Sequence, residues 1–253
     1  MTHPRGLTIR RFATAVQAAR ALARRVARDV RANPSLVLGL PTGRTPVLFY
    51  AELARLYGEG AVDFRRAVTF NLDEFVGMAA DDSRSYRAFM DRHLFSHVNL
   101  HPRRIHFLNG LEPDSASECR RYERQIARAG GIDLLILGLG VNGHIGFNEP
   151  GAALVADTHK TVLTRATRRA NAGLFGGHLR EVPGYAVSMG MATILRARHI
   201  VLLATGRNKA TAVRRLLQER ITTRVPASFL QLHPSVEVWV DQTAAAKLSD
   251  VAD

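Results

Sequence analysis

The sequence predicts an α/β fold built on a mainly parallel sheet, with helices on both faces. Two observations carry this prediction: short apolar runs recur along the chain, and segments with helical periodicity lie between most of them. Such runs are typical of strands buried on both faces, and strands that alternate with helices favour parallel pairing. No repeat or low-complexity linker interrupts the alternation. We therefore expect one doubly wound, Rossmann-like domain over residues 1–253.

The predicted strands share runs of mostly apolar residues. In chain order they are 36–40, 67–72, 105–108, 132–139, 186–189, 200–204 and 236–240. The predicted helices share apolar residues three or four positions apart, and they are 13–32, 46–57, 83–94, 115–129 and 209–218. Ligands of open parallel sheets bind beyond the carboxyl ends of the strands. The loops that follow the strands are therefore where functional residues are expected.

Composition narrows the class of protein. With 46% hydrophobic residues, a chain of 253 residues can fill a sizeable core. No stretch reaches the roughly 20 apolar residues of a membrane helix, and the basic N-terminus lacks the apolar run of a signal peptide. Cys119 is the single cysteine, which excludes an internal disulfide and a cysteine-based zinc cluster within one chain. We expect a cytoplasmic protein with no membrane association.

The formal net charge of +13 predicts an anionic ligand. Phosphorylated metabolites, nucleic acid and acidic membranes would all satisfy it. Many arginines between residues 20 and 31 alternate with alanine and valine at helical spacing, which is typical of the solvated face of an amphipathic helix. Because neither zinc-finger spacing nor an aromatic RNP-type strand accompanies them, no nucleic-acid partner is expected.

The loop after the strand at 36–40 is suited to a phosphate group. It carries Thr42, Gly43, Arg44 and Thr45, and then Pro46, a residue favoured at the first position of a helix. Free backbone N–H groups and hydroxyls at a helix N-terminus favour an anion. The loop has neither the glycine pattern of a dinucleotide fingerprint nor the ending of a P-loop. An ordinary turn capped by Thr45 is the alternative.

The loop at the end of the strand at 67–72 carries two adjacent acids, Asp73 and Glu74, flanked by Phe70 and Phe75. Partial burial raises the pKa of a carboxyl group toward the range of a general base, which proton abstraction beside a carbonyl or imine requires. A helix cap or a salt-bridge partner is the alternative for either acid.

The loop after the run at 132–139 surrounds one imidazole, His144, with glycines at positions 138, 140, 143 and 146. A histidine with so little side-chain bulk around it points to function rather than packing. Glu149 can hydrogen-bond the ring and fix its tautomer, and Asn142 can orient the ring or a substrate. The alternative is a glycine-rich turn with Asn142 and Glu149 as local caps.

Further candidates are single residues. Lys209 follows the strand at 200–204, from where its ammonium group could reach the same phosphate as the first loop; a solvated lysine is the alternative. His93 and His97 have the spacing of a zinc-binding helix, but no glutamate follows His93 and no third ligand lies nearby, so no metal site is expected.

Together these loops resemble the glucosamine-6-phosphate deaminase family. The similar stretches are 40–46, 69–75 and 143–150, joined by 85–86, 108–110, 183–186 and 226–233. They cover nearly the whole chain in order. The related 6-phosphogluconolactonases share the fold and a Gly-His loop, but the Phe-Asn-Glu-Pro ending at 147–150 and Asn-Leu-Asp-Glu at 71–74 look like the deaminase branch.

The resemblance implies conversion of glucosamine 6-phosphate and water to fructose 6-phosphate and ammonia, without a metal or organic cofactor. Asp73 matches the base of the family, which moves a proton between C2 and C1, and His144 matches the acid/base that opens the sugar ring. Asn142 and Glu149 match its two supporting positions. Because Asn142 stands where some members have Asp, Glu149 is expected to be the carboxylate partner of the imidazole.

One position departs from the family pattern at the phosphate. The family's phosphate-contacting arginine falls at Gly173, so Arg44, Arg168 or Arg169 could replace it, or the substrate could differ. Three alternatives follow: a deaminase of another amino sugar phosphate, a lactonase of the same fold, or a non-enzymatic sugar-phosphate sensor. The stretch 156–159 lacks the arginines of the longer hexameric members. This implies little or no activation by N-acetylglucosamine 6-phosphate, and a monomer or small homo-oligomer.

Overall fold

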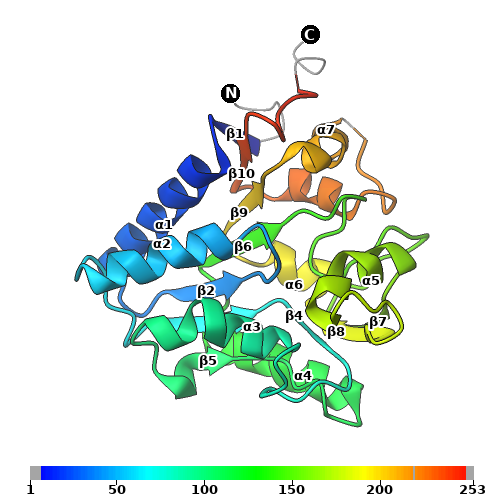
Figure 1. The fold of residues 1–253 in the computed structure, drawn as a ribbon, viewed down its shortest axis with the longest axis horizontal. Coiled ribbons are helices and arrows are strands. Elements are labelled where there is room, and N and C mark those ends of the chain that lie inside the picture. Colours follow the sequence, from blue (N-terminus) through cyan, green and yellow to red (C-terminus); the bar gives the residue numbers. More distant parts are fainter. Residues whose placement is uncertain (1–6, 219, 249–253) are drawn as a thin grey trace.

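The computed structural model describes residues 7–218 and 220–248, and within them a seven-stranded sheet forms the centre of the molecule (Figure 1). Its strand order is β1-β10-β9-β6-β2-β3-β5, and each neighbouring pair runs parallel. The strands are β1 (Leu7–Phe12), β2 (Val37–Leu40), β3 (Val68–Asn71), β5 (Ile105–His106), β6 (Leu134–Gly138), β9 (His199–Ala204) and β10 (Val236–Asp241). Parallel strands align their carboxyl ends, so the loops that follow them lie at one edge.

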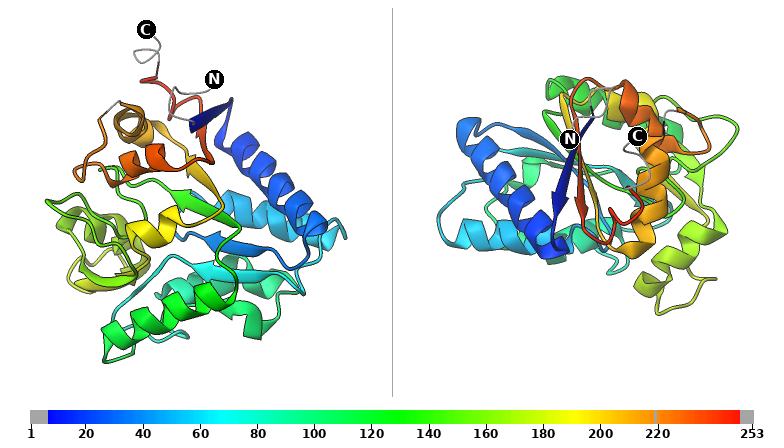
Figure 2. Two further views of the ribbon diagram at one scale, coloured as in Figure 1. Left: turned by 180° about the vertical axis from the view of Figure 1, so that it is seen from behind. Right: turned by 90° about the horizontal axis from the view of Figure 1, so that it is seen from above.

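Helices cover both faces of this sheet, as the views in Figure 2 show. One face carries α1 (Ala15–Ala32), α2 (Val47–Gly58) and α3 (Tyr86–His93). The other face carries α4 (Ser115–Arg128), α6 (Met191–Leu195), α7 (Ala210–Leu217) and the 3-10 helix η5 (Pro226–Leu232). Shorter 3-10 helices are η1 (Phe95–His97), η2 (Pro102–Arg104), η3 (Ala172–Phe175) and η4 (Arg207–Lys209). The predicted doubly wound α/β fold is confirmed.

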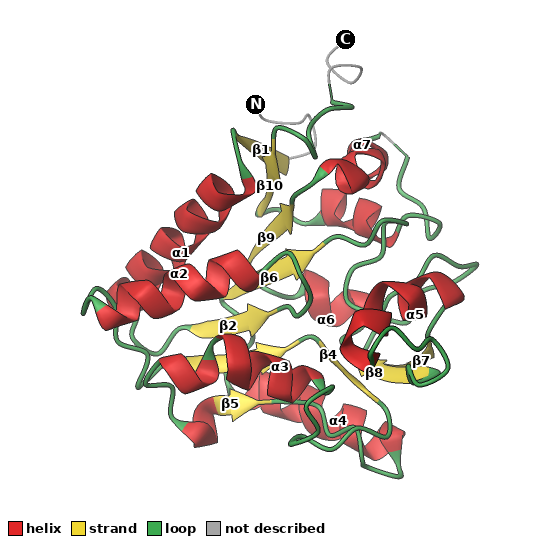
Figure 3. Cartoon of the chain, viewed as in Figure 1, coloured by secondary structure: helices red, strands yellow, loops and turns green. Residues whose placement is uncertain are grey.

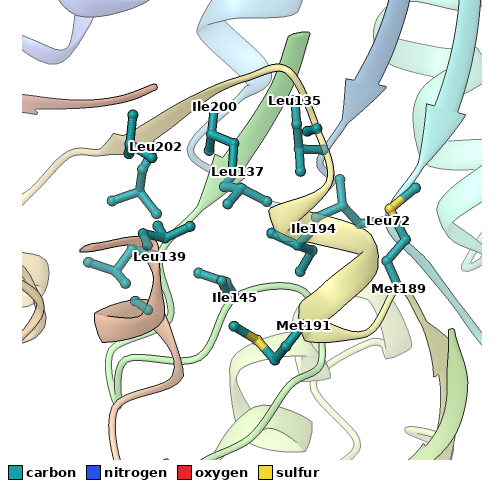
Figure 4. Packing of buried hydrophobic residues seen from close by; sticks show 14 of the residues in the cluster. Leu72, Leu135, Leu137, Leu139, Ile145, Met189, Met191, Ile194, Ile200 and Leu202 are labelled. Atoms are coloured by element: carbon teal, nitrogen blue, oxygen red, sulfur yellow. The ribbon is translucent and has the colours of Figure 1, made fainter. Parts of the chain in front are cut away.

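The central strand β6 shows why the strands read as continuous apolar runs. Leu134 and Ile136 pack toward α1 and α2, whereas Leu135 and Leu137 pack toward α6 and α7. Successive side chains of a strand point to opposite faces, and here both faces are buried. Figure 4 shows Leu135 and Leu137 on the second side, with Ile194 of α6 close by.

The arginine-rich helix α1 has the two faces that its sequence predicts. One face is buried against the sheet, while Arg24 and Arg28 on the other are exposed. Arg25 is an exception, since its guanidinium lies 2.8 Å from a carboxylate oxygen of Glu237 in β10.

A small antiparallel sheet stands beside the main one. In the described part of the chain its order is β4 (Asp73–Phe75), β8 (Tyr185–Ser188) and β7 (His159–Val162). Two predictions are corrected here. The run at 186–189 contributes β8 to this sheet instead of a strand to the parallel sheet, because its backbone pairs antiparallel with β4 and β7. Ala186 packs in the cluster of Phe75 and Phe147, whereas Val187 and Met189 pack in the core of the main sheet. The Asp73 loop is in fact strand β4.

Several elements escaped prediction because their sequences lack a continuous apolar run. β1 and β7 are edge strands with exposed residues, and the helices α5 (Arg165–Asn171) and α6 are short. The five predicted helices each begin within three residues of their expected start. That one domain takes up all of 1–253 stays a prediction, since 1–6, 219 and 249–253 lie outside the described residues. No described helix has the length and apolar character needed to cross a bilayer.

Candidate active site

The four loops selected from the sequence follow four neighbouring strands. Thr42 follows β2, Asp73 follows β3, His144 follows β6 and Lys209 follows β9, and these strands lie in the order β9-β6-β2-β3. Figure 3 shows that β2 and β6 point toward the side of the molecule that carries α5, β7 and β8. The sheet therefore delivers all four loops to one edge, opposite the small sheet.

The adjacent acids of β4 have different environments. Glu74 accepts hydrogen bonds from the backbone N–H groups of Phe75 (2.8 Å), Tyr86 (3.0 Å) and Arg87 (2.9 Å). It therefore serves the N-terminus of α3, where a carboxylate is favoured. Burial nevertheless raises the pKa of Glu74 to about 7 against these hydrogen bonds. The alternatives for this pair were a helix cap and a salt-bridge partner. Glu74 acts as a helix cap, because it accepts hydrogen bonds from the first N–H groups of α3.

Asp73 has no such partners. Its side chain is 7% exposed, and no residue within 7–218 and 220–248 donates a hydrogen bond to its carboxylate. Burial, and then the charge of Glu74, raise the pKa of Asp73 to about 8. The carboxylate also lies close to buried phenols, since burial and its negative charge raise the pKa of Tyr50 and of Tyr86. Asp73 is thus a desolvated carboxyl group with its titration near neutral pH.

The small sheet joins Asp73 to the histidine loop. Ser188 pairs with Asp73 across the sheet, and its hydroxyl accepts a hydrogen bond from the N–H of Phe147 (3.0 Å). Gly146, with a φ of 55°, lies between them: a Cβ there would be 3.0 Å from Oγ of Ser188 and 3.7 Å from Oδ2 of Asp73. The positive φ and the close approach to Ser188 favour glycine at this position.

The imidazole of His144 packs directly on the backbone of Gly140. A Cβ at position 140 would lie 2.4 Å from the ring, and the N–H of Gly140 donates to the carbonyl oxygen of His144 (2.9 Å). Of the four glycines near this histidine in the sequence, Gly140 is the one that provides space for the ring.

Glu149 is the carboxylate beside the imidazole. Its Oε2 lies 3.6 Å from Nδ1 of His144 and accepts a hydrogen bond from Nδ2 of Asn142 (2.9 Å). Its Oε1 accepts hydrogen bonds from the hydroxyls of Thr167 and Thr164. Burial opposes ionisation of Glu149, but its contacts with His144, Thr167 and Asn142 together lower its pKa. An ionised carboxylate next to a histidine stabilises the imidazolium form.

Two cations meet at the other end of the site. Burial, and then the charge of Arg44, lower the pKa of Lys209, which places these side chains close enough to repel each other. Gly43 has a φ of 98°, and the N-cap of α2 is Pro46, with no side-chain cap. The alternative of a turn capped by Thr45 therefore does not describe this loop.

Of the arginines considered as replacements at position 173, Arg44 is the one whose charge acts on Lys209. Arg168 donates to the carbonyl oxygens of Leu179 (2.9 Å) and Val182 (2.8 Å). Its guanidinium therefore joins α5 to the segment 179–182. Gly173 is exposed, and a Cβ there would meet nothing within 4 Å, so the position has room for a side chain.

Sequence reasoning missed the residues that support the site from α5 and α3. Thr164, Thr167 and Asn171 belong to or cap α5, and Tyr86 begins α3. Their signal is weak, because only the Thr-x-x-Thr spacing at 164–167 marks a helix start. In the described part of the chain, no three His, Cys, Asp or Glu side chains gather as a metal site would require.

A buried carboxyl group near neutral titration, an imidazole paired with a carboxylate, and two nearby cations define a site for acid/base chemistry on a small anionic substrate. The model of the glucosamine-6-phosphate isomerase/6-phosphogluconolactonase family matches residues 10–239. The chain belongs to this family.

Relatives and solved structures agree with this membership. The chain is 49% identical over 223 residues to a glucosamine-6-phosphate deaminase of Halothermothrix orenii, covering 88% of this chain and 92% of the relative. It is 47% identical to glucosamine-6-phosphate deaminase 1 of Giardia intestinalis, covering 88% and 84%. A monomeric glucosamine-6-phosphate deaminase superposes with a TM-score of 0.92 at 40% identity, covering 95% and 99%. A 6-phosphogluconolactonase from Trypanosoma cruzi (TM-score 0.77, 18% identity) shares the fold.

Proposed function

We propose that the chain is a glucosamine-6-phosphate deaminase, which converts glucosamine 6-phosphate and water to fructose 6-phosphate and ammonia. The observation that carries the proposal is the placement of buried Asp73 against the loop that holds His144 and Glu149, with Gly146 between them. The substrate is supported by relatives of that name, which match about nine-tenths of the chain.

His144 would open the sugar ring. The imidazole takes the proton of the O1 hydroxyl, the C1 carbonyl forms as the bond from C1 to the ring oxygen breaks, and the ring oxygen receives the proton. The negative charge of Glu149 stabilises the imidazolium between these steps, and Asn142 holds Glu149 in place.

Asp73 would move the proton from C2 to C1. As a carboxylate it takes the C2 proton of the open-chain sugar and gives it to C1. O1 takes up a proton and the substrate nitrogen gives one up, which leaves a hydroxyl group at C1 and an imine at C2. Water adds to C2 and ammonia leaves, so C1 is reduced and C2 oxidised without an external oxidant or reductant. A base with its pKa raised to about 8 is strong enough for this step, and the charge of a substrate ammonium group favours its ionised form.

The cationic end would bind the phosphate. Thr42, Gly43 and Thr45 supply hydroxyl and backbone N–H donors at the start of α2. Arg44 and Lys209 repel each other without an anion, and a phosphate dianion between them relieves that repulsion. In this assignment Arg44 replaces the arginine that the family carries at position 173.

The test is an assay of the purified chain with glucosamine 6-phosphate. Ammonia and fructose 6-phosphate should appear in equal amounts, and faster than with galactosamine 6-phosphate or 6-phosphogluconolactone. Faster turnover of either competitor would show that this competitor, and not glucosamine 6-phosphate, is the preferred substrate. Tight binding of the sugar phosphate without any turnover would instead indicate a sensor.

We also propose that the enzyme is a monomer of the cytoplasm without allosteric activation. The deaminase that superposes over 95% of the chain is described as monomeric, and the single cysteine, Cys119, suits a reducing compartment. In the stretch 156–159, Asp157 pairs with Arg196 (2.8 Å). Light scattering should give the mass of one chain, and N-acetylglucosamine 6-phosphate should leave hyperbolic kinetics unchanged. Sigmoidal kinetics abolished by that effector would contradict this.

A further inference from the structure

Three hydrogen bonds, linked through the residues that they share, connect Tyr86, beside the phosphate loop, to Glu149. At the first end, the side chain of Thr42 lies close enough to the phenol of Tyr86 to lower its pKa, and the phenol donates to Oδ1 of Asn171 (2.9 Å). Nδ2 of Asn171 donates to the carbonyl oxygen of Thr167 (3.0 Å), whose hydroxyl donates to Oε1 of Glu149. Every contact after Tyr86 passes through α5.

The direction of these hydrogen bonds is fixed by their chemistry. The amide of Asn171 must turn its nitrogen to the carbonyl oxygen of Thr167, so its oxygen faces the phenol. The single proton of Tyr86 is therefore given to Asn171. The phenol oxygen can only accept from Thr42, which has one hydroxyl proton of its own.

A bound phosphate competes for that proton. The hydroxyl of Thr42 can donate either to Tyr86 or to an anion in the loop, so the empty and occupied states differ in the hydrogen bonds at Tyr86. Tyr86 and Thr167 are 4% and 3% exposed, and burial makes such differences larger than they are in water. Arg44 gives a second, parallel link, because Nη2 lies 3.5 Å from the carbonyl oxygen of Ala170 in α5.

From this geometry we propose that α5 couples phosphate binding to the position and charge of Glu149, with Tyr86, Asn171 and Thr167 as positioning residues. The proposal rests on the proposed function in one respect, which is the role of Glu149 as partner of His144. α5 contacts both ends of the site, and in Figure 1 it stands beside β7 and β8, outside the main sheet. In this way, a phosphate bound at the cationic end changes the position and charge of Glu149 beside His144.

The direct test is the pKa of His144 measured by NMR with and without saturating inorganic phosphate. The resonance is assigned by its absence from His144→Gln. In the wild type, phosphate should raise the proton affinity of His144 about threefold, through the charge of the anion and through α5. Asn171→Ala should keep less than half of that shift, since only the through-space part and the weaker link through Arg44 and Ala170 remain.

Arg168→Gln is the matched control. It loosens the same helix by removing the hydrogen bonds to Leu179 and Val182, but it lies outside the three linked hydrogen bonds. It should keep the full phosphate-induced shift. The proposal would be overturned if the phosphate-induced shift in Asn171→Ala were as large as in the wild type. It would also be overturned if Arg168→Gln lost as much of the shift as Asn171→Ala.

Kinetics provide a second readout that a purely structural role would not move. Thr167→Val should lower kcat about tenfold with little change in KM, and Thr167→Ser should restore it, since the hydroxyl is the acting group. Tyr86→Phe combined with Thr167→Val should cost less than the product of the single effects; strictly multiplicative effects would count against coupling.

The phosphate titration needs no turnover, so it separates this proposal from the proposed function. A wild type that forms no ammonia but shows the shift refutes the deaminase and keeps the coupling. An active wild type whose His144 ignores phosphate refutes the coupling and keeps the deaminase.

Discussion

The two ends of the site are built in opposite ways. At the proton-transfer end, Asp73 is buried with no hydrogen-bond donor among the described residues, and desolvation sets its charge state. Glu149 is enclosed by donors, and these contacts set its charge state. At the phosphate end, Arg44 is exposed and Lys209 is half-buried, so charge and solvent share control. Rate should therefore depend on single atoms at the first end, whereas affinity at the second is distributed over several groups and weakened by salt.

A loss of kcat second only to that of Asp73→Asn is expected from His144→Gln. An amide can hydrogen-bond the substrate but cannot carry a proton, so kcat should fall about 10³-fold while KM changes less than about threefold. Steady-state assays with glucosamine 6-phosphate measure both. A kcat within a few-fold of the wild type would show that another group opens the ring.

The second effect concerns stability, and it tests whether burial sets the charge of Asp73. The pKa of Asp73 is about 8 in the folded protein, above the usual 3.8. Between pH 3.8 and pH 8, the folded state therefore keeps a proton on Asp73 that the unfolded chain has lost. The wild type should lose stability as pH rises through that window. Asp73→Asn removes this dependence and should raise the free energy of unfolding at pH 9 by about 2 kcal/mol.

Urea titrations at pH 5 and pH 9 measure this difference. The gap between Asp73→Asn and the wild type should be wider at pH 9. A gap independent of pH would mean that Asp73 is ionised in the folded enzyme throughout.

A smaller effect is expected at the phosphate end. Arg44→Gly should raise KM about tenfold, leave kcat nearly unchanged and weaken the salt dependence of kcat/KM. Because Gly173 has open space for a side chain, Gly173→Arg in the Arg44→Gly background should recover several-fold in KM. Gly173→Ala is the control. A fall in kcat in Arg44→Gly would mean that the cationic end contributes to the proton-transfer steps as well as to substrate binding.

The smallest effect compares the adjacent acids of β4. Glu74→Gln replaces a carboxylate at the N-terminus of α3 and weakens the hydrogen bonds from Tyr86 and Arg87, so it should destabilise the protein by about 1 kcal/mol at neutral pH. The urea midpoint measures this loss. A kcat loss as large as that of His144→Gln would mean that Glu74 takes part in the chemistry.

The predicted site loops meet because a parallel sheet aligns the ends of its strands. For this reason, the sequence alone was sufficient to predict that Thr42, Asp73, His144 and Lys209 lie at one edge of the sheet. Glycines around a histidine likewise indicated space for its ring, which the packing of Gly140 explains.

Contacts between distant segments could not be predicted in this way. The partner of Glu74 at Tyr86 lies 12 residues away, and Thr167 reaches Glu149 across 18 residues. The run at 186–189 has the same apolar composition whether its strand pairs in parallel or antiparallel. It belongs to the small sheet because it pairs antiparallel with β4 and β7, which are distant in the sequence.

The central claim is that Asp73 moves the proton between C2 and C1, and deuterium exchange tests it most directly. Fructose 6-phosphate and ammonium are incubated with the enzyme in D₂O, and NMR follows deuterium entering C1. The account predicts exchange in the wild type, slower exchange in His144→Gln, and none above the enzyme-free rate in Asp73→Asn, which should still bind fructose 6-phosphate by calorimetry. Exchange at the wild-type rate in Asp73→Asn would contradict the account.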